Sequence, residues 1–180
     1  MAYLGSTSLF AGQIEFIRRW IEAGAPEKGK VVAGENLLDD KTLAIVDDET
    51  FKPMAAPKDG DGIQLKVEKF EIAPIFEREL FVRREIGNKE PLYVNKLKFQ
   101  SRQNSHHMVV YAFKEKAVLP AVNVTRDLRQ PDNSLNILTA LSIGEHIFLG
   151  GGTDASQEYI FPEGAALLLP PNATVDLNPH

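Results

Sequence analysis

From Ile63 onward the pattern of apolar and polar positions becomes that of short strands. In IQLKVEKF, apolar side chains alternate with polar ones at Ile63, Leu65 and Val67, as on a strand with one face against a core. Segments rich in Val, Tyr, Phe and Leu follow, each bounded by turn residues; they are RELFVRREI, LYVNKLKFQ, HMVVYAF, NSLNILTALS, EHIFLGGG, QEYIFPEG, AALLLPPNA and TVDLNPH. Many short strands with regular breaks predict a mainly β, antiparallel sandwich or barrel. No helix is predicted between Ile63 and His180, and the run GGGT at 150–153 is interpreted as a turn.

A helical period governs the first part of the chain. Apolar residues recur there at helical spacing; they are Ile14, Phe16, Ile17, Trp20 and Ile21. Ser6 or Ser8 is placed to cap the start of this helix, and Gly24 with Pro26 to end it. A helix of about four turns cannot bury its own apolar stripe, so we expect one short N-terminal helix that needs a partner surface.

These patterns divide the chain into three parts. Residues 1–26 hold the helix, residues 27–61 form a linker rich in charged residues, Gly and Pro, and residues 62–180 form the β domain. A short strand is possible at TLAIV, residues 42–46. Both ends look cut, so we expect a fragment of a longer protein.

Composition excludes several classes of function. The chain has 180 residues, a net charge of −5 and no basic cluster, which argues against nucleic acid or an anionic membrane surface as a partner. It has no cysteine, which excludes thiolate zinc sites, a cysteine nucleophile, disulfides and covalent haem attachment. No apolar stretch has membrane-spanning length, and the N-terminus lacks the pattern of a signal peptide.

The histidines are the main candidates for chemistry. Four are present, and His106 and His107 stand together at the start of an apolar run. Neighbouring residues on a strand point to opposite faces, so the pair can reach one metal ion only if the strand begins irregularly, which the preceding RQNS permits. Three neutral imidazoles without a thiolate suit copper or zinc. The third ligand would be His180 or, as an alternative, His146; otherwise the pair is a polar strand edge.

Longer motifs carry a family resemblance. YVNKLKFQSRQNSHHMVVYAF together with the distant FPEGAALLLPPNATVDLNPH resembles the N-terminal half of the copper type II, ascorbate-dependent monooxygenases, the family of peptidylglycine α-hydroxylating monooxygenase and dopamine β-monooxygenase. The resemblance covers roughly residues 63–180. It implies a jelly-roll β-sandwich and one copper ion held by His106, His107 and His180. In that family this copper stores and passes an electron supplied by ascorbate, while a second copper, on another domain, hydroxylates a C–H bond.

The chain also departs from the family. It contains no HxH motif for the second copper, so the resemblance implies an electron-transfer domain with no catalytic residue of its own, inactive as an isolated chain. It lacks the disulfides of animal members, which favours a divergent, bacterial type. The implied partners are a second copper domain and an electron donor such as ascorbate or a cytochrome domain, in a periplasmic or secreted parent protein.

The N-terminal helix has a resemblance of its own. QIEFIRRWIEAGAP resembles the last helix of a class I c-type cytochrome domain, in which Trp20 and AGAP would close the fold. No CxxCH motif is present, so haem c would belong to a longer parent protein. The alternative is a docking helix at residues 13–23.

Two other functions stay open at this point. One is a non-catalytic β-sandwich that serves as a binding or interaction module and whose histidines are incidental. The other is a zinc hydrolase that uses the three histidines, with Glu145 as the only candidate acid or base.

Overall fold

A computed structural model describes most of the chain and divides it into two units, Met1–Asp47 and Asp48–His180. The described residues are 9–30, 36–42, 51–72, 76–102 and 105–180. The possible strand at 42–46 lies, except for Thr42, outside these ranges.

The first unit contains helix α1, Ala11–Glu22, and the short 3-10 helix η1, Leu37–Asp39. The N-cap position of α1 is Phe10, and the Gln13 side chain accepts a hydrogen bond from its amide at 2.8 Å. Ser6 and Ser8, predicted as caps, lie outside the described residues. The C-terminal end matches the sequence, because Gly24 takes a left-handed φ of +84° just beyond it.

Close contact between α1 and η1 depends on a glycine. Gly12 is buried, and a Cβ atom at that position would lie 1.7 Å from the carbonyl oxygen of Leu37. The apolar stripe of α1 is much less covered. Its members are between 36% and 60% exposed; they are Ile14, Phe16, Ile17, Trp20 and Ile21.

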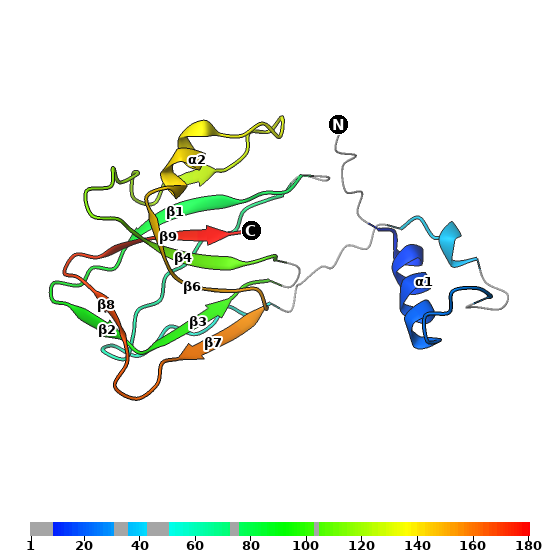
Figure 1. The fold of residues 1–180 in the computed structure, drawn as a ribbon, viewed down its shortest axis with the longest axis horizontal. Coiled ribbons are helices and arrows are strands. Elements are labelled where there is room, and N and C mark those ends of the chain that lie inside the picture. The colour runs from blue at the N-terminus through cyan, green and yellow to red at the C-terminus, as the bar shows by residue number, and fades with distance from the viewer. Residues whose placement is uncertain (1–8, 31–35, 43–50, 73–75, 103–104) are drawn as a thin grey trace. The chain divides into compact units, whose positions relative to one another are not determined.

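The second unit is mainly β and antiparallel, as predicted (Figure 1). Its elements are β1 Leu80–Glu85, β2 Leu92–Val94, β3 Lys96–Gln100, β4 Met108–Phe113, β5 Thr125–Asp127, α2 Ile137–Ile143, β6 His146–Gly152, β7 Ser156–Ile160, β8 Leu167–Leu169 and β9 Thr174–Pro179. The largest sheet has the order β5-β1-β9-β4-β6, and two smaller sheets pair β2 with β8 and β3 with β7. Nonconsecutive strands therefore meet at the centre of the large sheet.

The core is built on β1 and β9, the central strands. Consecutive residues of β1, Leu80–Val82, are each 1% exposed, as are Val175 and Leu177 of β9. Asp176, on the opposite face of β9, is 0% exposed. Because consecutive side chains point to opposite faces of a strand, both faces of β1 and β9 are covered. Burial on both faces holds such a strand in place along its length, and His180 directly follows β9.

Two strand predictions were wrong. Residues 137–143, inside NSLNILTALS, form helix α2, which begins with a hydrogen bond from the Ala140 amide to the Asn136 carbonyl at 2.9 Å. A single helix of two turns shows too few apolar positions to reveal a helical period. The prediction of no helix after Ile63 fails for the same reason.

The segment IQLKVEKF, residues 63–70, belongs to no strand. The alternation holds at Leu65 and Val67, which are half-buried around the exposed Lys66, but not at Ile63, which is 51% exposed. The Lys66 carbonyl accepts hydrogen bonds from the Arg84 side chain at 3.0 and 3.1 Å, whereas a strand would bond to main-chain groups. The segment therefore packs on one side but forms no ladder of main-chain hydrogen bonds with a neighbouring strand.

The glycines at 150–152 lie in β6, so their interpretation as a turn was also wrong. A Cβ atom at Gly150 would lie 2.7 Å from Leu97 Cδ1, and one at Gly152 would lie 3.2 Å from Phe99 Cβ. Both contacts are with β3. The missing side chains thus allow β3 to pack closely on β6.

Candidate metal centre

His106 and His107 meet His180 through an irregular piece of backbone. The His180 carbonyl accepts hydrogen bonds from the amides of His106, at 2.7 Å, and His107, at 3.2 Å, while the His180 amide donates to the His107 carbonyl at 2.9 Å. Two residues of one strand that oppose a single residue of its partner form a β-bulge, which redirects side chains. The bulge explains how neighbouring histidines reach the same place, and it occurs where RQNS indicated an irregular strand start.

The three rings converge on a small volume. Nδ1 of His180 lies 3.1 Å from Nδ1 of His106 and 3.2 Å from Nε2 of His107, and one nitrogen from each ring lies within 4.8 Å of the others. Metal–nitrogen bonds of about 2.0–2.1 Å at tetrahedral or trigonal angles require nitrogens roughly 3.3–3.6 Å apart. The cluster is close to that geometry and could hold a metal ion. The predicted trio is brought together; ligation itself stays a prediction.

The environment of His107 favours the neutral ring. Partial burial, followed by the proximity of His180, lowers the pKa of His107 below its ordinary value. Its Nδ1 is buried and has no hydrogen-bond partner among the described residues. A neutral imidazole is the form that binds metal ions, so this site needs little proton release from His107.

Two carboxylates accompany the cluster, and neither was predicted from the sequence. Glu77 Oε1 lies 2.8 Å from Nε2 of His180. Glu79 accepts a hydrogen bond from the Asn178 side chain at 3.1 Å, and the same amide also donates to the Leu80 carbonyl at 3.0 Å. The spacing of two between Glu77 and Glu79, just before β1, was the available signal. Nothing in the sequence linked that segment to His180.

His146 does not belong to the cluster. It pairs with Phe113, at the end of β4 that is farther from His107. Along an extended strand, His107 and Phe113 are about 20 Å apart. It therefore cannot replace His180 as the third ligand. The main-chain carbonyl of Glu145 accepts a hydrogen bond from the Lys114 amide at that same far end, so the candidate acid or base of a hydrolase lies far from the cluster.

His146 instead belongs to a buried ionic network beneath α2. Its Nε2 lies 2.9 Å from Asp176, a fully buried residue of β9. The Arg126 guanidinium donates to both oxygens of Asp176 and, at 3.1 Å, to Ser142 of α2. The His146 ring also stacks on Tyr111 with centroids 4.7 Å apart. The network ties α2, β4, β5 and β6 to β9 and so anchors the strand that ends next to His180.

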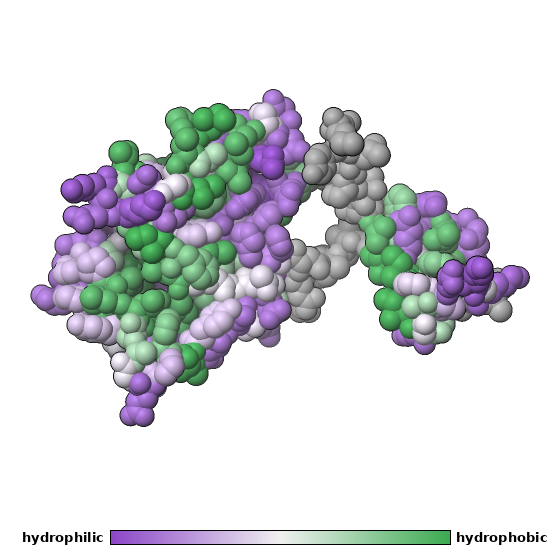
Figure 2. Space-filling model, in the orientation of Figure 1, coloured by the Kyte–Doolittle hydropathy of each residue, from purple (hydrophilic) through white to green (hydrophobic). Residues whose placement is uncertain are grey.

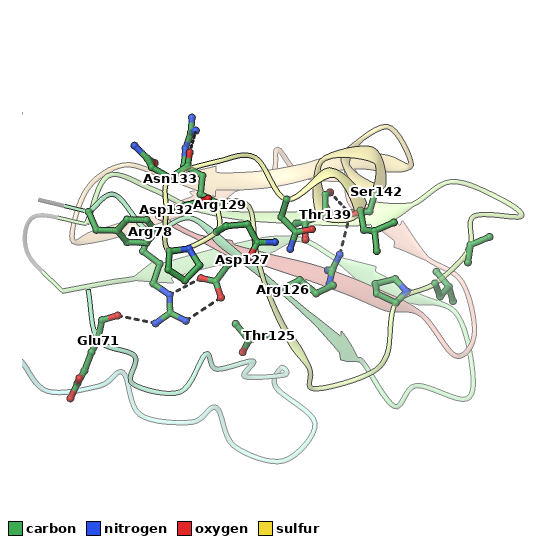
Figure 3. Close-up of a pocket in the computed structure, with 18 residues that line it drawn as sticks. Glu71, Arg78, Thr125, Arg126, Asp127, Arg129, Asp132, Asn133, Thr139 and Ser142 are labelled. Carbon is green, nitrogen blue, oxygen red and sulfur yellow. Dashed lines mark hydrogen bonds and ion pairs between the residues drawn. The ribbon is translucent and has the colours of Figure 1, made fainter. Parts of the chain in front are cut away.

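A cleft of about 1010 Å³ lies elsewhere, beside α2 (Figure 3). Its lining includes Thr139 and Ser142 of α2, and Arg78 paired with Asp127 at 2.6 Å. The Arg78 guanidinium also donates a hydrogen bond to the carbonyl of Glu71, which lines the same cleft. No histidine of the cluster lines it, so the cleft and the candidate metal centre are separate features.

Comparisons with protein-family models, curated proteins and solved structures found no match to the chain. In the described ranges there is also no helix with the length and apolar character needed to cross a membrane.

Proposed function

We propose that His106, His107 and His180 bind one copper ion and that the β unit is the electron-transfer domain of a copper- and ascorbate-dependent monooxygenase. The observation that carries the proposal is the convergence of three ring nitrogens within 4.8 Å at a β-bulge. Bound copper would supply a one-electron carrier. The family assignment, the jelly-roll arrangement and the identity of the metal rest on SHHM and DLNPH, which resemble the family's motifs.

The chain's own residues would hold the ion in a fixed place. The bulge presents His106 and His107 from the start of β4, and His180 follows directly on β9. β9 is anchored by Asp176 and Asn178, which are 0% and 1% exposed and lie on the same face as His180. Ligands on anchored strands keep their geometry as the charge of the ion changes, which favours electron transfer over chemistry at the metal.

The proposal includes partners that lie outside the described residues. Among the described residues, the three histidines are the one group of three or more His, Asp or Glu side chains close enough together to hold a metal ion. We therefore propose that hydroxylation needs a second copper domain in the parent protein. Ascorbate or a cytochrome domain, of which α1 would be the last helix, would supply electrons in a periplasmic or secreted setting.

Copper titration into the metal-free protein tests this function. We expect one Cu(I) or Cu(II) per chain, and loss of the electron paramagnetic resonance signal of Cu(II) when ascorbate is added. His180→Ala should weaken binding sharply. Circular dichroism and the urea midpoint of the variant control for folding. Absent binding, or binding indifferent to His180, would overturn the proposal and leave a β module with incidental histidines.

A further inference from the structure

His180 is the one ring of the cluster held from both sides by side chains. Its Nδ1 faces His106 and His107 at 3.1 and 3.2 Å, and its Nε2 lies 2.8 Å from Glu77 Oε1. The side chain of His180 is 13% exposed, whereas that of Glu77 is 69% exposed. The ring therefore lies between a candidate ion and a carboxylate that reaches in from solvent.

This placement selects which nitrogen of His180 faces the ion. A neutral imidazole carries its proton on one nitrogen and its lone pair on the other. A carboxylate accepts but does not donate, so Glu77 holds the proton on Nε2 and leaves the lone pair on Nδ1, toward the cluster. The carboxylate also increases the electron density that the ring can donate to a bound ion.

The charge of the surroundings adds a preference between oxidation states. Glu77 is in contact with His180, and Glu79, two residues along, is close enough to act electrostatically on His107. Three neutral imidazoles bring no charge. A divalent ion therefore balances the two carboxylates, and a monovalent ion leaves a net negative charge.

We propose that Glu77 is a positioning residue that orients His180 through its Nε2–H and makes the centre favour divalent over monovalent ions. The inference rests on the proposed function, because it concerns the same three histidines. It assigns a role to a residue that the motif resemblance does not contain.

Replacement of Glu77 is a clean test because the side chain is mostly exposed. Glu77→Gln keeps an acceptor but removes the charge, and Glu77→Ala removes both. Glu85→Gln, at the other end of β1 and 64% exposed, is the matched control. Affinities for Cu(II), Zn(II) and Cu(I) are measured at one fixed pH by competition with chelators of known strength.

We expect Glu77→Gln to lose about 10–100-fold in affinity for Cu(II) and Zn(II). The loss for Cu(I) should be smaller, and Glu77→Ala should lose at least as much as Glu77→Gln. Glu85→Gln should match the wild type. Wild-type affinity in Glu77→Gln, or equal losses for both oxidation states, would overturn the inference while the three-histidine site stands. If the wild type binds no metal, the proposed function fails and the inference with it.

Discussion

Asp176→Asn removes the charge at the centre of the buried network, and we expect it to destabilise the β unit strongly. Asp176 is 0% exposed at its side chain, and its partners Arg126 and His146 are 15% and 2% exposed. The substitution leaves the guanidinium largely buried without a counter-ion. Removing one member of a buried ion pair costs about 3–5 kcal/mol, because the remaining charge keeps its desolvation penalty.

Urea denaturation followed by circular dichroism gives the free energy of unfolding of each variant. Asp127→Asn is the matched control on β5, since the pair it forms with Arg78 has side chains 32% and 25% exposed. Partly exposed pairs of this kind contribute about 0–1 kcal/mol. Adding Arg126→Met to Asp176→Asn removes the uncompensated cation and should recover part of the loss. If Asp176→Asn costs no more than Asp127→Asn, the argument that the network anchors β9 is wrong.

Two further predictions follow from the site and from α1. The pKa of His107 is lowered from its ordinary value of 6.5, so below that pH the unfolded chain binds a proton that the folded, metal-free protein does not. The free energy of unfolding should therefore be highest above about pH 6.5 and fall as the pH drops toward the lowered pKa. Urea midpoints at several pH values measure this, and His107→Asn should flatten the dependence; an unchanged slope would contradict it. Gly12→Ala forces a methyl group onto the Leu37 carbonyl, so hydrogen exchange in α1 should speed up by about tenfold or more, and unchanged protection would refute the contact.

The fold was predictable where a short run of strand-forming residues lies between turn residues. β4, β7 and β9 were read correctly because their apolar or β-branched residues lie between turn residues. α2 was missed because two helical turns are too short to show a period. The extended segment at 63–70 alternates like a strand, yet pairing depends on a partner that no local pattern reveals.

The site was predictable only in part, for a related reason. SHHM and DLNPH predicted that His106, His107 and His180 form one group, and RQNS indicated an irregular start. The bulge itself depends on the pairing of β4 with β9, which is a long-range contact. Glu77 could not be found, because its approach to His180 depends on the pairing of β1 with β9 across about half the chain.

X-ray absorption of the copper-loaded protein tests the central claim most directly, because it counts the imidazoles on the ion. The account predicts three nitrogen ligands at about 2.0 Å with outer-shell scattering from three rings, and two rings after His180→Ala. A spectrum with one or no imidazole, or one that His180→Ala leaves unchanged, would contradict a shared three-histidine centre.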